Sequence, residues 1–190
     1  IKSGEFFYPM DLGKGMVVPR DYKFKRPWGL PVRYHDFDIL QKKTNVDFLE
    51  FHLSYKDMDQ EVESFFPEAY DVDFAVHSPD LFPGDHLLNL AEKDESSRKR
   101  SVAELQRVIE IARRLKPFFK KTDRVPLIVS VGGFSKDRPI SREYRGILYD
   151  RVAKSLSELD TDGVEILPQT LPPFPWYFGG QLYCNIFVDA

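Results

Sequence analysis

The feature that most constrains this chain is a regular alternation of short apolar runs with longer amphipathic segments from residue 46 onward. The apolar runs span residues 48–54, 74–79, 127–133 and 164–167. Such alternation predicts parallel strands joined by right-handed helical crossovers. Eight strand–helix units close a barrel, so four of them predict a fold of the α/β class, namely part of a (β/α)8 TIM barrel.

The segments between these runs predict helices. Residues 97–119 carry an apolar residue at every third or fourth position, which is typical of an amphipathic helix. A shorter helix is expected at residues 57–66. Ser141 is expected to cap a further helix, with an inner stripe formed by Tyr144, Ile147, Leu148, Val152, Leu156 and Leu159.

Residues 1–36 read differently and predict a small, separate β module, followed by a short helix or linker at 37–45 and the barrel part at 46–190. Basic and aromatic residues alternate in residues 23–28, which fits an edge strand with one solvated face. Two interpretations stay open for Lys25 and Arg26. They either bind an anion or belong to that solvated face.

Composition excludes several classes of protein. Hydrophobic residues make up 42% of the 190 residues, which excludes a disordered chain, and the net charge of −3 gives no footprint for nucleic acid. No apolar run is long enough to cross a bilayer. Cys184 is the single cysteine, which favours a reducing, cytoplasmic location. Because the sequence starts without methionine and stops after an apolar stretch, we expect a fragment of a longer protein.

Polar side chains stand near the expected carboxyl ends of the strands, where barrels place their active sites. An imidazole there is suited to acid–base chemistry or to metal binding. Glu50 and His52 share one strand face, because side chains repeat every second residue. The candidates at the strand ends are His52, Ser54, His77, Asp80, Ser130, Glu165 and Gln169.

An unusually aromatic and proline-rich loop follows the fourth run, with Trp176 near its centre and Gly179-Gly180 at its end. Proline reduces the entropy lost when a loop becomes ordered, and aromatic rings bury large apolar areas. The loop is expected either to form a wall against a sugar or to cover one end of the barrel. The glycines favour the wall, because they let the backbone approach a ligand closely.

The order of motifs in residues 46–190 resembles the xylose-isomerase-like, endonuclease-IV-like barrels, in their sugar phosphate isomerase/epimerase branch found with surface-polysaccharide genes. The motifs are VHSPD, LNLAEKDESSRKRSVAELQRVIEIARRL, IVSVGG and PPFPWYFGG. Residues 1–36, with GKGMVVPRDYKFKRPWG, resemble the SAF (antifreeze-like) domain of sialic acid synthases. Together they resemble part of a fused sialic or nonulosonic acid biosynthesis protein.

The resemblance implies an enzyme that isomerises or epimerises a sugar or sugar phosphate. It makes His77 the first metal-binding histidine, whereas Ser130 and Gln169 stand where a histidine and a glutamate ligand are usual. A divalent metal is therefore expected to bind weakly or not at all. The expected catalytic residues are His77, Glu165 and His52, and the expected substrate-binding residues are Gln169, Ser130, Trp176, Lys25 and Arg26.

Two other functions stay open from the sequence. One is condensation of phosphoenolpyruvate with an amino sugar by the parent protein, and the other is carbohydrate binding without catalysis. In every case the expected partner is a small sugar rather than nucleic acid or a membrane. The open edge of a partial barrel also predicts self-association or pairing with the missing part of the chain.

The aromatic loop yields a first test. If it is a wall of the binding site, Trp176→Ala should weaken sugar binding and leave the free energy of unfolding nearly unchanged. If it packs as a plug, the substitution should instead cost about 3–5 kcal/mol of stability. Urea denaturation and sugar titration of the same variant separate these outcomes, and we expect the first.

Overall fold

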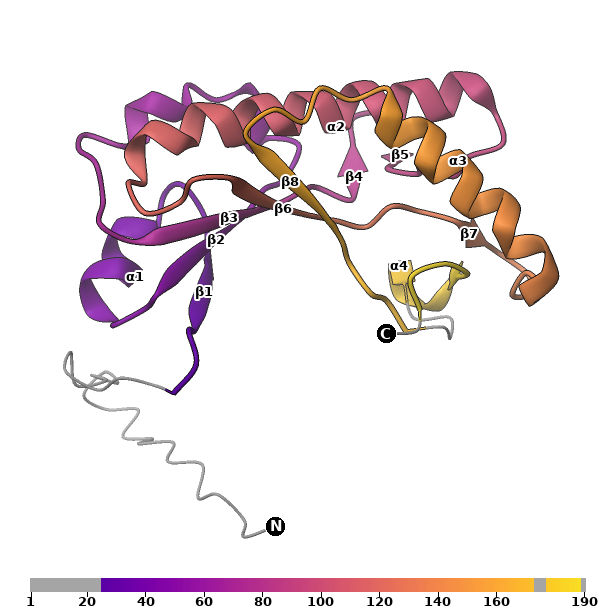
Figure 1. Cartoon of the computed structure of the whole chain (residues 1–190), viewed down its shortest axis with the longest axis horizontal. Helices are drawn as coiled ribbons and strands as arrows, with labels where there is room; N and C mark the ends of the chain where they lie inside the picture. Colours follow the sequence, from indigo (N-terminus) through magenta and orange to yellow (C-terminus); the bar gives the residue numbers. More distant parts are fainter. Residues whose placement is uncertain (1–24, 173–176, 189–190) are drawn as a thin grey trace, which may run out of the picture.

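The computed structural model describes residues 25–172 and 177–188, and its centre is a five-stranded parallel sheet in the order β1-β2-β3-β6-β8 (Figure 1). All neighbouring strands pair in parallel. This confirms an α/β fold with a parallel sheet, consistent with part of a TIM barrel. The strands are β1 Gly29–Val32, β2 Phe48–His52, β3 Asp73–His77, β6 Val125–Val129 and β8 Val164–Pro168.

The predicted boundary at residue 36 is wrong, because β1 belongs to the same sheet as the other strands. Gly29 pairs with Phe48, and Val32 pairs with Phe51. Pro31 made this segment a poor strand candidate, but proline is tolerated on an edge strand such as this one. The rest of the expected SAF-like module, residues 1–24, lies outside the described residues.

The helix α2 runs along one side of the sheet, and α3 lies mostly beyond the strands and meets α2 through Arg98 and Ser155 (Figure 1). Asp94 caps α2 by accepting a hydrogen bond of 2.8 Å from the backbone N–H of Ser97. Two small antiparallel pairs follow β3 and β6, namely β4 Leu81–Phe82 with β5 His86–Leu87, and β7 Phe134–Ser135 with β9 Tyr183–Cys184. The helices are α1 Phe37–Lys43, α2 Glu95–Leu115, α3 Arg145–Ser157 and α4 Tyr177–Gly180.

The described residues include four short 3-10 turns, and three of them, η1, η2 and η4, change two helix predictions. Instead of an α-helix at residues 57–66, η1 and η2 form two separate turns. Ser141 does not cap α3, because the turn η4 intervenes and the Ser141 hydroxyl donates to the Glu143 carboxylate instead. The turns are η1 Asp57–Asp59, η2 Val62–Phe65, η3 Lys116–Phe118 and η4 Arg142–Tyr144.

The buried stripe of α3 differs in part from the predicted one. Leu148 and Val152 are buried as predicted, but Tyr144 and Ile147 are 61% and 53% exposed. Tyr144 lies in η4 rather than in α3, and Ile147 stands one residue off the buried stripe that Leu148, Val152 and Ser155 form. The predicted inner stripe is therefore wrong at its amino-terminal end.

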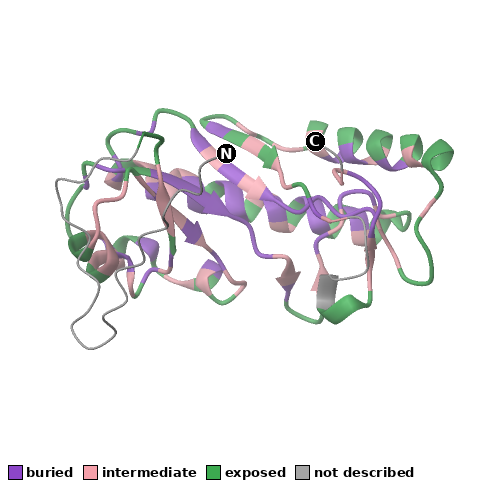
Figure 2. Cartoon of the chain, turned by 90° about the horizontal axis from the view of Figure 1, so that it is seen from below, coloured by how far each residue is buried: buried purple, intermediate pink, exposed green. Residues whose placement is uncertain are grey.

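The two faces of the sheet differ in burial, which Figure 2 shows as alternating colours along the strands. Leu49 and Phe51 on β2 are fully buried within the core beneath the helices. Phe51 belongs to an aromatic cluster that also contains Phe37, Phe66 and Phe119. The intervening residues, such as Glu50 and His52, point to the opposite face and are only partly covered. This open face carries the polar strand-end residues.

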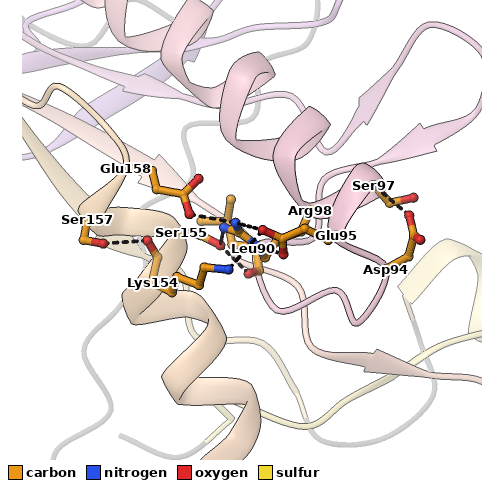
Figure 3. Close-up of polar contacts among 9 residues, drawn as sticks. All are labelled: Leu90, Asp94, Glu95, Ser97, Arg98, Lys154, Ser155, Ser157 and Glu158. Carbon is orange, nitrogen blue, oxygen red and sulfur yellow. Dashed lines mark hydrogen bonds and ion pairs between the residues drawn. The ribbon is translucent and has the colours of Figure 1, made fainter.

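A buried arginine joins the two long helices (Figure 3). The Arg98 side chain on α2 is 1% exposed and contacts Glu95 and Glu158, each at 2.7 Å. It also donates a hydrogen bond of 2.8 Å to the hydroxyl of Ser155 on α3, which in turn donates to the Leu90 carbonyl. The guanidinium holds the pKa of the Glu95 carboxyl at about 2, chiefly through its hydrogen bond. The helix pair is therefore fixed by charge-assisted contacts.

We expect Arg98→Met to lower the free energy of unfolding by about 2–3 kcal/mol, because hydrogen bonds to charged groups are lost and Ser155 is left with one partner fewer. Arg107→Met is the matched control on the same helix. Arg107 is 48% exposed in its contacts with Asp59 and Glu104, so its loss should cost less than about 1 kcal/mol. Urea denaturation measures both values, and equal losses would contradict the special role of Arg98.

Candidate functional site

The candidate site lies at the carboxyl ends of the central strands, on the open face of the sheet. His52 ends β2, His77 ends β3, and the register pairs these two residues directly. Ser130 follows β6, and Gln169 follows β8. Parallel strands bring such residues to one edge, and barrel enzymes use that edge for catalysis.

Three side chains form a compact cluster there, which we call the histidine cluster: Glu50, His52 and His77. Each offers one ligand atom, and these atoms lie within 4.8 Å of one another. His52 Nε2 lies 2.6 Å from a carboxylate oxygen of Glu50. The two imidazole rings stack with their centroids 4.1 Å apart and an angle of 25° between their planes. The sequence predicted only that Glu50 and His52 share one strand face. The pairing of β2 with β3 brings His77 next to them.

A neutral hydrogen-bonded group adjoins the histidine cluster. Gln169 Oε1 lies 3.2 Å from His77 Nε2 and accepts a hydrogen bond of 3.2 Å from the Ser130 hydroxyl. The backbone N–H of Gln169 donates to the Val129 carbonyl, which extends the pairing of β6 and β8 by one bond. The structure therefore brings together four predicted site residues from four strand ends, His52, His77, Ser130 and Gln169.

The electrostatics favour a neutral ring at His52. Partial burial lowers its pKa below the ordinary 6.5, and nearby His77 lowers it further. The carboxylate of Glu50 acts in the opposite direction, and the guanidinium of Arg33 adds a small lowering contribution. His52 is thus an imidazole that can take up a proton at neutral pH, with a carboxylate in contact to stabilise the charged form.

The other predicted residues lie elsewhere. Glu165 is exposed on β8, where it pairs with Pro126 of β6. His77 pairs with Ile128, which in turn pairs with Leu167. Glu165 therefore lies two residues nearer the amino end of its strand than the level of His77. Lys25 and Arg26 are exposed and precede β1, so they lie at the opposite end of the strands from the histidine cluster. Trp176 lies outside the described residues.

Sequence reasoning missed Arg33, which directly follows β1. Its Nη1 lies 3.3 Å from Asp57 Oδ2, the same oxygen that accepts hydrogen bonds of 2.7 Å from the backbone and hydroxyl of Ser54. A charged residue at the carboxyl end of a strand would have indicated Arg33, but the sequence did not predict a strand at residues 29–32.

Comparison with known proteins identifies the family of the chain. The model of the family "Xylose isomerase-like TIM barrel" matches residues 40–185, so the chain belongs to that family. The match starts at residue 40 and does not bear on the SAF-like module expected at residues 1–36.

A solved structure has a similar fold. It is the crystal structure of a D-tagatose 3-epimerase-like protein, with 23% sequence identity and a TM-score of 0.51. The match covers 76% of this chain and 54% of that chain, so the sequence spans about half of the related structure. No curated protein is significantly similar to the chain. Among the described helices, none has the length and apolarity needed to cross a membrane.

The pKa of His52 provides a test of the cluster. We expect its ring to titrate below 6.5, and we expect His77→Gln to raise the pKa, because a neighbouring ring that can carry like charge is removed. Because the folded-state pKa of His52 lies below 6.5, the unfolded chain binds the proton more readily. The contribution of His52 to the free energy of unfolding is therefore fully present above pH 6.5 and declines as the pH falls through the folded-state pKa. NMR titration of the imidazole C–H signals measures these values, and a His52 pKa above 6.5 would contradict the proposed environment.

Proposed function

We propose that this chain carries part of the active site of a sugar isomerase or epimerase, which moves a proton next to a sugar carbonyl. The observation that carries the proposal is the histidine cluster at the carboxyl ends of β2 and β3. Membership of the Xylose isomerase-like TIM barrel family supports a sugar or sugar phosphate as the substrate.

The histidine cluster fits a divalent metal ion by donor type and by proximity. Two imidazoles and one carboxylate are a known catalytic zinc set, which leaves a position for substrate or water. Glu50, His52 and His77 would hold the ion, since their ligand atoms lie within 4.8 Å of one another. When bound, the ion would polarise the carbonyl oxygen of the sugar. Ser130 and Gln169 are not needed in this set, so the weak binding inferred from those two positions does not apply to it.

Proton transfer can be assigned to the chain's own residues. Without an ion, neutral His52 is the base, and Glu50 stabilises the imidazolium through the contact of 2.6 Å. If His52 instead serves as a metal ligand, its nitrogen is no longer available, and the base that the sequence leaves is Glu165, which faces the open side of the sheet but stands apart from the cluster. Gln169 and Ser130 supply hydrogen bonds to sugar hydroxyls in both cases.

A second candidate function is carbohydrate binding without catalysis. It is favoured by the uncharged pair of Gln169 and Ser130, which hydrogen-bond to each other at 3.2 Å and replace the ionic ligands expected there. The role in sialic or nonulosonic acid synthesis, including condensation with phosphoenolpyruvate by a parent protein, rests on the resemblance of residues 1–36 and remains a proposal.

Calorimetric titration with Zn²⁺ or Mn²⁺ tests the cluster as a metal site. We expect binding that His77→Ala and Glu50→Gln each weaken at least tenfold, because each removes one of three ligands. His35→Ala is the control, since the ring of His35 is 77% exposed and lies outside the cluster. If all variants bind alike, the metal site is wrong.

Turnover of ketose and aldose sugars with and without the ion tests the reaction. Loss of hydrogen exchange at the carbon next to the carbonyl in metal-free His52→Gln, relative to the metal-free wild type and with sugar binding retained, would assign proton transfer to His52. The same loss in Glu165→Gln would assign it to Glu165. Sugar binding without any exchange in the wild-type chain would favour the binding domain.

A further inference from the structure

Arg33 shares the open face with the histidine cluster. Val32 pairs with Phe51, and both residues are buried. Because side chains alternate along strands, the next residues, Arg33 and His52, both lead to the opposite face. Arg33 therefore stands beside His52 at the carboxyl end of β1.

The guanidinium of Arg33 is only lightly engaged. Its side chain is 39% exposed, and one nitrogen lies 3.3 Å from Asp57. The Asp57 oxygen in this contact already accepts two shorter hydrogen bonds from Ser54. Glu50, the carboxylate of the cluster, is in contact with His52 rather than with Arg33. In the part of the chain that the structure describes, the other N–H groups of Arg33 have no side-chain acceptor.

The arginines of α2 are engaged differently. Four of its five arginines each contact at least two carboxylates in the described residues, as Arg107 does with Asp59 and Glu104. The same holds for Arg98, Arg113 and Arg114, whereas Arg100 donates to the Pro83 carbonyl. Arg33 therefore combines unused donors with a position at the site.

We propose that Arg33 binds an anionic oxygen group, phosphate or carboxylate, on the sugar whose reacting carbons lie at the histidine cluster. This inference rests on the proposed function and narrows its substrate class. A guanidinium presents its N–H donors in a planar fork that matches such oxyanions. Lys25 and Arg26, which the sequence offered for anion binding, lie at the opposite end of the strands.

The test uses inorganic phosphate and, separately, acetate as probes, with the metal-free chain followed by ¹⁵N NMR. In the wild type, phosphate should shift the side-chain N–H signal of Arg33. Arg33→Gln should weaken the phosphate affinity at least tenfold, whereas the control Arg107→Gln should leave it unchanged. Tighter binding of acetate than of phosphate would identify a sugar acid as the substrate class, and the reverse would identify a sugar phosphate.

The backbone N–H signals of Ser54 and Asp57 distinguish anion binding by Arg33 from a purely structural role. If the role is anion binding, these signals should keep their positions in Arg33→Gln. If these signals move, the Arg33→Lys variant is measured instead, because lysine keeps the positive charge but lacks the planar N–H donors of the guanidinium. Weaker phosphate binding with unmoved signals supports the proposal, and unchanged affinity overturns it. The proposal is also overturned if neither phosphate nor acetate shifts the side-chain N–H signal of Arg33 in the wild type. The measurement needs neither metal nor turnover, so its failure and the failure of the proposed reaction are distinguishable.

Discussion

The candidate site depends on the register between β2 and β3. Five consecutive pairs, from Phe48 with Asp73 to His52 with His77, place the two imidazoles side by side. A shift of one residue would turn His77 toward the helices and break the cluster, because side chains alternate between the two faces. The register is fixed from the other face, where Phe51, Phe74 and Val76 are buried in the core. Packing beneath the helices thus determines the chemistry on the open side.

The helix layer holds this packing in place through both apolar and charged contacts. The apolar stripe of α2 supplies fully buried residues such as Leu105 and Ile109. At the amino-terminal end of α2, buried Arg98 links the helix to α3 through Ser155 and Glu158. A buried guanidinium requires that its acceptors be correctly placed, so this contact specifies how the two helices meet. These helices cover only one face of the sheet, and the opposite face, which carries Glu50 and His52, is only partly covered.

On the open face, Glu50 and His52 are partly exposed, whereas His77 is buried. His52 is half-buried, which lowers its pKa, and Glu50 remains close enough to stabilise the charged form. Gln169 and Ser130 add hydrogen bonds without adding charge. Arg33, at the end of the neighbouring edge strand, supplies a positive charge near the same place. Such a combination of acid–base, neutral and cationic groups fits a polar sugar better than an apolar ligand.

The sequence by itself determined the strand–helix order, because apolar runs and helical periodicity are local signals. It also identified His52, His77, Ser130 and Gln169 as strand-end residues. It could not reveal that Gly29–Val32 is a strand, since a four-residue edge strand with Pro31 has little local signal. Only the tertiary structure decided that Glu50, His52 and His77 form one cluster, that Glu165 stands apart, and that Arg33 lies at the same end of the sheet as the cluster. The physical reason is that strand neighbours and register arise from long-range pairing, whereas periodicity records only which face of each element is buried.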